Sequence, residues 1–235
     1  YPGCAGEMSD IVLNTLPENE ILRYLGCPPD DENTLALVRP CAEDLCKTAR
    51  PRTLRRAFPI TVQEEGVIIG KNALFLPGQD LVRVLIGCSR AVLFCATLGS
   101  AVDSLLRKEQ LCDMTRSVIL DSCASVAIEA VCDQVEEAVR ADYPNDYLSS
   151  RYSPGYGDVP ISIQRNFLAL LDAPRKIGLC ATDSSILTPR KSVTAIIGLS
   201  NHPIEKPKKN CATCWMRDRC AFRKKEEHCG LSQTD

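Results

Sequence analysis

A run of about 30 residues without proline or glycine, at positions 113–142, constrains the fold of this chain more than any other feature. Within it the apolar residues Ile128, Val131, Val135 and Val139 follow one another at intervals of three or four. This spacing places their side chains on one face of a helix, and that face must pack against a core. The sequence therefore predicts one long helix over 113–142, ended by the Tyr-Pro-Asn that follows it.

A second strong signal is the continuous apolar run RAVLFCAT at residues 90–97, which predicts a strand buried on both faces. Shorter patterns predict the remaining elements. We expect helices over 17–26, 30–50, 79–86, 101–108 and 162–171, the last with Ser162 as its N-cap, and strands over 58–62, 66–69, 177–180 and 192–199. Because helices and strands alternate irregularly, we expect an α+β fold, in which a mixed or antiparallel sheet packs against long helices in a single main domain.

The composition is that of an ordinary globular protein and argues against several function classes. The 235 residues are 45% hydrophobic and 25% charged, and the net charge is -2. Such a chain is not expected to bind nucleic acid or an anionic membrane surface. The most apolar uncharged run, Ala91 to Val102, is shorter than the ~20 residues of a membrane helix. No signal segment opens the printed sequence, and we expect a cytoplasmic protein.

Ten of the fourteen cysteines are scattered between Cys4 and Cys180, mostly inside apolar segments such as Leu93-Phe94-Cys95-Ala96. A free thiol behaves as a small buried hydrophobe. We therefore expect most of these ten residues to be reduced members of the core, as is usual in a reducing compartment.

The other four cysteines form a compact group near the end of the printed sequence. Cys211, Cys214, Cys220 and Cys229 have the spacing C-x2-C-x5-C-x8-C within 19 residues. Four thiolates can close a tetrahedral zinc site or hold an iron–sulfur cluster, and either would supply folding free energy to a segment with little core of its own. The uneven spacing favours [4Fe–4S], with zinc as the alternative metal and His228 as an alternative ligand to Cys229.

A proline- and glycine-rich stretch, RYSPGYGDVP at residues 151–160, carries several groups suited to a ligand. Arg151 presents a fork of donors that matches a carboxylate or a phosphate. Gly155 lets a ligand approach the backbone, Tyr156 offers a ring and a hydroxyl, and Asp158 can accept from an ammonium or a ribose hydroxyl. On these residues alone, the stretch is either a simple surface turn or a binding loop.

This stretch and its flanks resemble the S-adenosylmethionine-binding activation domain of cobalamin-dependent methionine synthase. RYSPGYGDVP is similar to the R-x-x-P-G-Y motif of that domain, and residues 124–143 look like the helix that precedes the motif. The segment TPRKSVT at 188–194 resembles still more a family of short stand-alone proteins with this domain, in which SPGYGD and P-x-KSVT recur. The likeness is strongest over 119–200 and thin before residue 90.

The resemblance implies a binding site for S-adenosylmethionine. In that reading Arg151 pairs with the carboxylate of the ligand, Glu129 of the long helix takes its ammonium or a ribose hydroxyl, and the motif residues line the pocket. The candidate cofactor-binding residues are Arg151, Pro154, Gly155, Tyr156, Glu129 and Asp158.

The resemblance also implies an accessory role in methyl transfer. In that family, cobalamin oxidised to Co(II) is restored to methylcobalamin by one electron and a methyl group from S-adenosylmethionine, and the domain positions the methyl donor. The cobalamin is expected on a partner, a corrinoid methyltransferase without its own activation domain, and the cysteine tail would relay the electron from a donor. The alternative is a non-catalytic module that binds S-adenosylmethionine or a corrinoid protein and has a structural zinc tail.

Three positions depart from the family pattern. That domain has a proline after the motif tyrosine, where this chain has Gly157. It has a tyrosine in its late strand, where this chain aligns Ile197, and an acidic residue in its N-terminal region for which Asp103 is the candidate. These departures predict a looser pocket or a different ligand.

Composition divides the chain into four expected parts. We expect an N-terminal region over 1–90 that packs on the main domain, and an S-adenosylmethionine-binding domain over 91–200. A polar, proline-containing linker over 201–210 would then lead to the cysteine-rich tail over 211–229.

Overall fold

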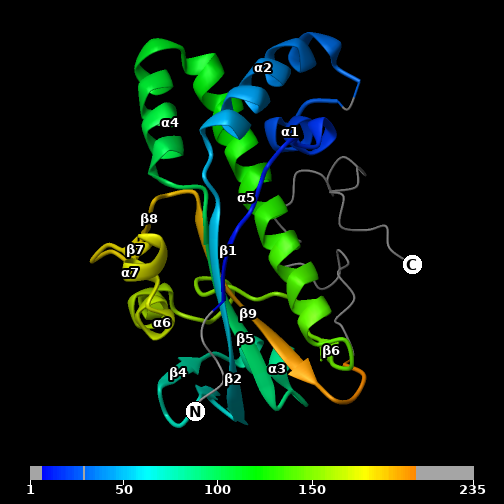
Figure 1. The fold of residues 1–235 in the computed structure, drawn as a ribbon, viewed down its shortest axis with the longest axis vertical. Coiled ribbons are helices and arrows are strands. Elements are labelled where there is room, and N and C mark those ends of the chain that lie inside the picture. Colours follow the sequence, from blue (N-terminus) through cyan, green and yellow to red (C-terminus); the bar gives the residue numbers. More distant parts are fainter. Residues whose placement is uncertain (1–6, 29, 205–235) are drawn as a thin grey trace. The chain divides into compact units, whose positions relative to one another are not determined.

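The computed structural model describes residues 7–28 and 30–204, and those up to Pro203 belong to one compact unit (Figure 1). The four tail cysteines and His228 lie outside the described residues. The helices are α1 (Glu18–Leu25), α2 (Glu32–Thr48), α3 (Gln79–Leu85), α4 (Ser100–Cys112), α5 (Met114–Asp142), η1 (a 3₁₀ turn, Ile161–Ile163), α6 (Gln164–Leu171) and α7 (Ala173–Ile177). The strands are β1 (Glu7–Asp10), β2 (Arg52–Gln63), β3 (Gly66–Ile69), β4 (Leu74–Pro77), β5 (Arg90–Thr97), β6 (Tyr147–Leu148), β7 (Cys180–Ala181), β8 (Leu187–Thr188) and β9 (Ser192–Ser200).

One antiparallel sheet organises the described part of the chain. Its strands run in the order β4-β3-β2-β5-β9-β6, β1 pairs with β2, and every one of these pairs is antiparallel. β7 and β8 form a separate two-stranded sheet. The predicted α+β fold with long helices is confirmed. β2, from the N-terminal part of the sequence, pairs with β5 over eight residues, so the segment before residue 90 supplies strands to the same sheet.

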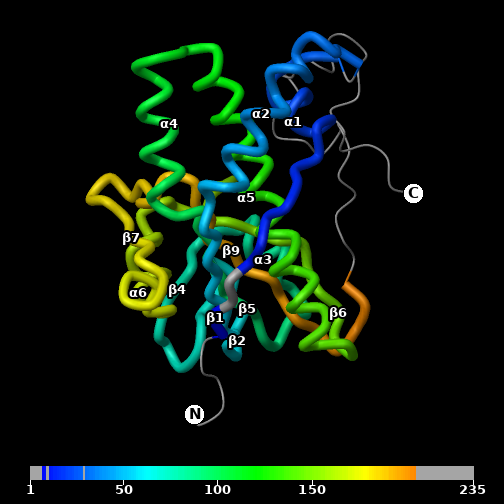
Figure 2. The backbone as a smooth tube through the Cα atoms, turned by 45° about the horizontal axis from the view of Figure 1, so that its top comes forward, coloured from blue at the N-terminus to red at the C-terminus, as the bar shows by residue number. Residues whose placement is uncertain are grey.

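β5 is buried on both faces, as its apolar run predicts. Val92 and Phe94 belong to the hydrophobic cluster that includes α5, while Leu93 and Cys95 point to the other face and are equally buried. The two views of the chain place α6 and α7 on that second side of the central strands (Figures 1 and 2). The strand therefore lies inside a three-layer arrangement of helix, sheet and helix.

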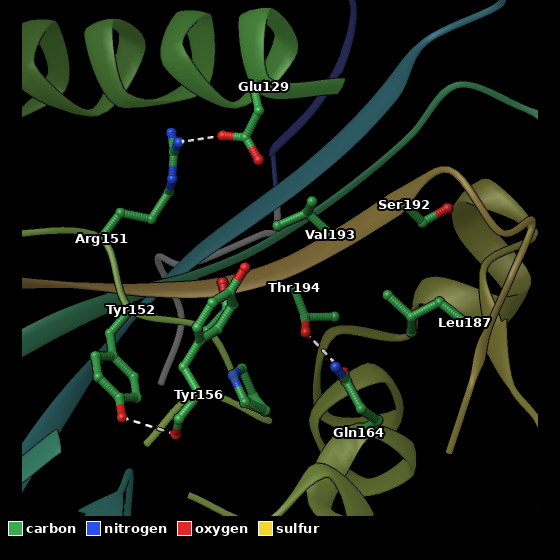
Figure 3. Close-up of a pocket in the computed structure, with 11 residues that line it drawn as sticks. Glu129, Arg151, Tyr152, Tyr156, Gln164, Leu187, Ser192, Val193 and Thr194 are labelled. Carbon is green, nitrogen blue, oxygen red and sulfur yellow. Dashed lines mark hydrogen bonds and ion pairs between the residues drawn. The ribbon is translucent and has the colours of Figure 1, made fainter. Parts of the chain in front are cut away.

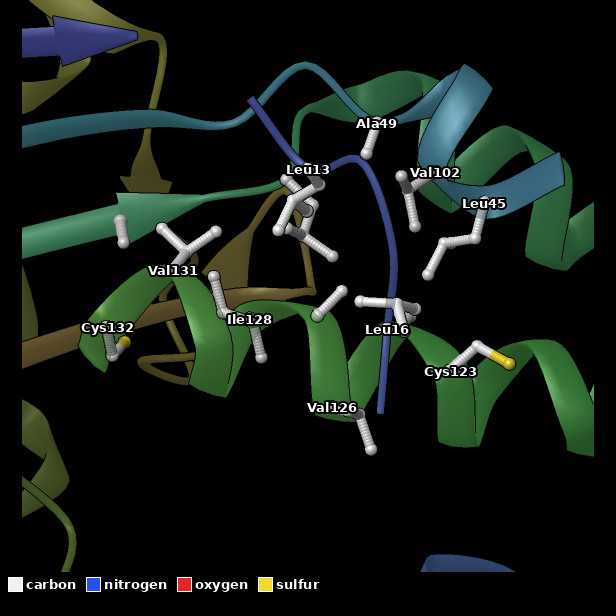
Figure 4. Packing of buried hydrophobic residues seen from close by; sticks show 14 of the residues in the cluster. Leu13, Leu16, Leu45, Ala49, Val102, Cys123, Val126, Ile128, Val131 and Cys132 are labelled. Carbon is white, nitrogen blue, oxygen red and sulfur yellow. The ribbon is translucent and has the colours of Figure 1, made fainter. Parts of the chain in front are cut away.

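The predicted long helix is α5. Its N-cap is Asp113, whose carboxylate accepts a hydrogen bond from the Arg116 N–H at 3.0 Å, the usual way to satisfy a free helix-end donor. The whole predicted stripe is buried, and the segment with Leu13 and Leu16 crosses over the helix (Figure 4). Each such buried aliphatic side chain contributes about 1.5–3 kcal/mol to the hydrophobic free energy of folding.

Two local predictions near the end of the fold need correction. The strand predicted over 177–180 begins only at Cys180, as β7. Residues 173–177 form α7, because Pro174 suits the first turn of a helix and Gly178, with φ +69°, closes it. Ser162 does not cap a helix, because it lies inside the 3₁₀ turn η1 and α6 begins at Gln164 without a side-chain cap. The hydrogen-bond ladders also lengthen the predicted strand 58–62 into β2 and add β4, which the sequence does not predict.

Within the described ranges, no helix is both long and apolar enough to cross a bilayer.

Several thiols are core residues, as the sequence predicts. Cys41, Cys88, Cys95, Cys123 and Cys132 are buried, whereas Cys112 and Cys180 are exposed. Burial raises the pKa of Cys95, Cys123 and Cys132 from 9.0 to about 12, because a thiolate loses its hydration there. These three groups therefore keep their protons in the folded chain at pH values where they ionise in the unfolded chain.

This difference predicts an alkaline loss of stability. The neutral thiols make their full contribution to the free energy of unfolding below pH 9, and this contribution is lost as the pH rises from 9 towards 12. We expect each buried thiol to lower the free energy of unfolding by about 1.4 kcal/mol per pH unit above 9. Urea denaturation with reductant at pH 8 and pH 10 measures it. Cys123→Ala should reduce the pH slope more than Cys112→Ala at an exposed position, and equal slopes would contradict the prediction.

Candidate functional site

Backbone hydrogen bonds hold the start of the 151–160 loop against the edge of the sheet. Tyr152 donates its N–H to the Ile196 carbonyl at 3.0 Å and accepts from the Ile196 N–H at 2.8 Å. Neighbouring residues of an extended segment point to opposite sides. Arg151 accordingly reaches α5, while the Tyr152 ring lies on the other side, near Asp80 of α3. Pairing with β9 thus decides which side chain faces the helix.

The Tyr152 side chain fixes the turn that follows. Its hydroxyl donates to the Tyr156 carbonyl at 2.8 Å (Figure 3). Burial, with the carboxylates of Asp80 and Asp158 nearby, raises the pKa of Tyr152 to about 12. The hydroxyl therefore keeps its proton and remains a hydrogen-bond donor over the physiological pH range.

Two glycines shape the loop around Tyr156. Gly155 and Gly157 have φ values of +94° and +54°, a region that L side chains rarely adopt. At Gly157 a Cβ would also collide with the Asp80 carboxylate and come within 2.6 Å of the Tyr152 hydroxyl. Glycine at 157 is therefore required by the close approach of α3 and Tyr152, and the proline found there in the resembling domain does not fit this backbone.

A pocket of about 400 Å³ lies between α5, this loop, α6 and β9 (Figure 3). That volume falls in the range of small-molecule sites. Its lining residues are Glu129, Arg151, Tyr152, Ser153, Pro154, Tyr156, Gln164, Leu187, Ser192, Val193 and Thr194.

One end of the pocket is charged. The Arg151 guanidinium donates to the Glu129 carboxylate at 2.8 Å and to the Asp133 carboxylate at 3.1 Å, both on α5. Desolvation opposes the charge on Arg151, but Cys132 and the two carboxylates outweigh it and raise the pKa of the guanidinium. Arg151 is mostly covered, with 21% of its side chain exposed, whereas Glu129 is half exposed. This end can exchange its internal ion pair for a ligand that has both a carboxylate and an ammonium group.

The other end of the pocket is neutral. Gln164, at the start of α6, is 5% exposed, and Thr194 of β9 is 1% exposed. The Thr194 hydroxyl donates to the Gln164 side-chain carbonyl at 2.6 Å. In the close-up Gln164 and Leu187 lie across the pocket from Arg151 and Glu129 (Figure 3). Such a site suits an uncharged group that accepts and donates hydrogen bonds.

The structure brings together four of the six predicted binding residues. Glu129, Arg151, Pro154 and Tyr156 line the pocket, and Tyr156 is 62% exposed at its side. Gly155 is not among the lining residues and supports the loop by donating its N–H to the Val159 carbonyl, at 3.0 Å.

Asp158 does not line the pocket, and its carboxylate has a structural role instead. Its carboxylate accepts from the N–H groups of Gln79 and Asp80, at 2.6 and 3.2 Å, and so satisfies free donors at the start of α3. The interaction joins residues almost 80 positions apart, which no local pattern reveals.

The sequence did not identify Gln164 or Thr194 as site residues. A signal was present at Thr194, because it is a hydroxyl in an otherwise apolar stretch of a buried strand. Gln164 gave none, since a glutamine at the start of a helix is ordinary.

Two positions marked as departures lie elsewhere. Ile197 is fully buried in the cluster that includes α5 and does not line the pocket. Asp103 lines a second cavity of about 250 Å³ and accepts from the Arg190 N–H at 2.8 Å. Among residues 7–28 and 30–204, no group of three or more His, Cys, Asp or Glu side chains is arranged to hold a metal ion.

Comparisons with known proteins support the fold assignment. No protein-family model matches the sequence, and no curated protein matches it. Among the solved structures, the chain is similar to a crystal structure of the MetH reactivation domain bound to AdoHcy. The TM-score is 0.67 with 17% sequence identity, and the alignment covers 96% of this chain and 87% of that one. The two chains share their fold.

Proposed function

We propose that the pocket binds S-adenosylmethionine and that the chain uses it to reactivate a cobalamin-dependent methyltransferase. The observation that carries the proposal is the Arg151–Glu129 pair, which lies 2.8 Å apart at the charged end of a pocket of ligand size. The fold shared with a MetH reactivation domain bound to AdoHcy, the demethylated form of the same ligand, also supports it.

The methionine end of S-adenosylmethionine is a zwitterion. Its carboxylate would take one branch of the Arg151 fork, and its ammonium would take the Glu129 carboxylate. Both protein groups keep a partner of opposite charge in this exchange, so neither becomes a buried unpaired ion. Asp133, whose side chain is 68% exposed, continues to hold the far side of the guanidinium.

The remaining parts of the ligand match the rest of the pocket. The sulfonium would lie near the exposed ring of Tyr156, whose face attracts cations. The adenosine would extend towards Gln164, Leu187 and Thr194.

Methyl transfer from a sulfonium to reduced cobalt does not require a protein nucleophile. One electron converts Co(II) to Co(I), whose electron pair takes the methyl carbon as its bond to sulfur breaks, and S-adenosylhomocysteine leaves. The contribution of the chain is to bind the ligand with its methyl group open to the partner. The partner would be a corrinoid methyltransferase, and the electron would come from a separate low-potential donor.

Two measurements test the proposal. Calorimetry with millimolar S-adenosylmethionine should detect saturable binding, and no heat would contradict it. The full chain, a low-potential reductant and S-adenosylmethionine labelled in the methyl group should then convert a cob(II)alamin-bearing partner to labelled methylcobalamin. Omission of the chain is the control. Binding without any transfer would favour the non-catalytic module.

The tail is a separate part of the proposal. We infer that Cys211, Cys214, Cys220 and Cys229 hold a [4Fe–4S] cluster that relays the electron, with zinc as the alternative. Iron, sulfide and zinc analysis of anaerobically purified protein distinguishes a relay from a structural site.

A further inference from the structure

We propose that Gln164 reads the purine base of the ligand, so that the pocket selects adenosine over other nucleosides. This inference rests on the proposed function and adds to it a residue that determines specificity. It arises from a buried side-chain amide whose hydrogen-bonding capacity is only partly used.

Thr194 holds one end of the Gln164 amide. Both side chains are at least nine-tenths buried, and the Thr194 hydroxyl donates to Oε1 of Gln164 at 2.6 Å. In the structure Oε1 faces the Thr194 hydroxyl, and Nε2, with its two protons, is the free end of the amide.

That free end belongs to the pocket. Within residues 7–28 and 30–204, no group accepts a hydrogen bond from Gln164 Nε2. Yet Nε2 is not among the fully enclosed polar atoms that lack a partner, and Gln164 lines the cavity. A polar group in this position is expected to be satisfied by a bound molecule.

The chemistry of the amide matches adenine. A carbonyl oxygen has two lone pairs, so Oε1 can accept from an adenine amino group in addition to the Thr194 hydroxyl. Nε2 can donate to a neighbouring ring nitrogen, which completes the two-bond contact that glutamine makes with adenine. Inosine has a carbonyl oxygen in place of the amino group and a protonated N1, and it would leave Oε1 facing an acceptor.

The position of the amide agrees with this role. Gln164 lies across the pocket from Arg151 and Glu129 (Figure 3). The base and the amino-acid group are at opposite ends of S-adenosylmethionine. One ligand can therefore reach both ends of the pocket.

The test compares the affinities of S-adenosylhomocysteine and S-inosylhomocysteine by calorimetry. We expect the wild-type chain to prefer the adenosyl compound by roughly 10- to 100-fold. Gln164→Leu should reduce that ratio of affinities towards one, because it lowers the affinity for the adenosyl compound only. Arg165→Gln, at the next and exposed position, is the matched control and should keep the wild-type ratio.

A second pair of variants tests the orienting contact without changing Gln164. Thr194→Val removes the hydroxyl and should lower the adenosyl preference, whereas Thr194→Ser should retain it. These variants also decide the matter if Gln164→Leu does not fold. An unchanged ratio in Thr194→Val or in a folded Gln164→Leu variant would overturn the inference while leaving the proposed function intact. If neither compound binds the wild-type chain, the proposed function is wrong and this inference is wrong with it.

Discussion

Replacing Arg151 by alanine is expected to lower the affinity for S-adenosylmethionine by about 100-fold or more. The variant removes the donors that would bind the ligand carboxylate, and it also leaves Glu129 and Asp133 without their cation. The charged end of the pocket then has two carboxylates and no cation, so it repels a carboxylate. Loss of one partner from a largely desolvated charge pair typically reduces binding by about 2–5 kcal/mol. Calorimetric titration of the variant with the ligand measures the effect.

Controls separate this loss from unfolding. The two carboxylate partners of Arg151 are half or more exposed, so their ion pairs contribute only about 1 kcal/mol or less to stability. The thermal midpoint of Arg151→Ala should therefore stay close to that of the wild type. Arg140→Ala removes a different ion pair from α5, the helix that carries Glu129 and Asp133, and should bind the ligand as the wild type does. Arg151→Lys keeps the charge without the fork and should bind with intermediate affinity. Wild-type affinity in a folded Arg151→Ala variant would refute the proposed carboxylate contact.

Substituting Gly157 by proline is expected to destabilise the chain by about 3 kcal/mol or more. Proline fixes φ near −65°, whereas Gly157 has φ +54°. The ring atoms would also enter the space already held by the Asp80 carboxylate and the Tyr152 hydroxyl. The hydrogen bond from Tyr152 to the Tyr156 carbonyl should be lost with the turn. Urea denaturation measures the change in the free energy of unfolding.

Two alanine variants divide this effect into its causes. Gly87→Ala tests the left-handed backbone alone, because Gly87 has φ +78° and a Cβ there meets open space. We expect it to destabilise the chain by about 1 kcal/mol. Gly157→Ala adds the collisions and should be more destabilising than Gly87→Ala. If Gly157→Pro were as stable as the wild type, the loop would not have the backbone described here.

The spacing of apolar residues predicted those helices and strands whose formation depends on residues close to one another in the sequence. The stripe over 113–142 and the apolar run at 90–97 were sufficient for α5, β5 and the α+β class, because burial follows directly from such spacing. The strand expected over 177–180 begins only at Cys180, for a related reason. A short apolar run is ambiguous, and there Pro174 and Gly178 favour a helical turn.

The chemistry of the motif predicted part of the candidate site. Arg151, Pro154 and Tyr156 are close in sequence, and Glu129 was placed through the resemblance of its helix, so these four residues could be expected to share a pocket. Whether they bind S-adenosylmethionine remains a prediction. The same loop chemistry assigned Asp158 to the ligand, but in the structure its carboxylate accepts hydrogen bonds from N–H groups at the start of α3.

The sequence by itself determined the long helix, the doubly buried strand and the presence of a glycine-rich loop with an arginine at its head. The tertiary structure decided which way that loop faces, because the pairing of Tyr152 with Ile196 sets Arg151 towards α5. It also decided the Gln164–Thr194 contact and the close approach that demands Gly157. Each of these depends on groups from different elements meeting at a fixed register. Local propensity acts within a few residues and contains no information about that register.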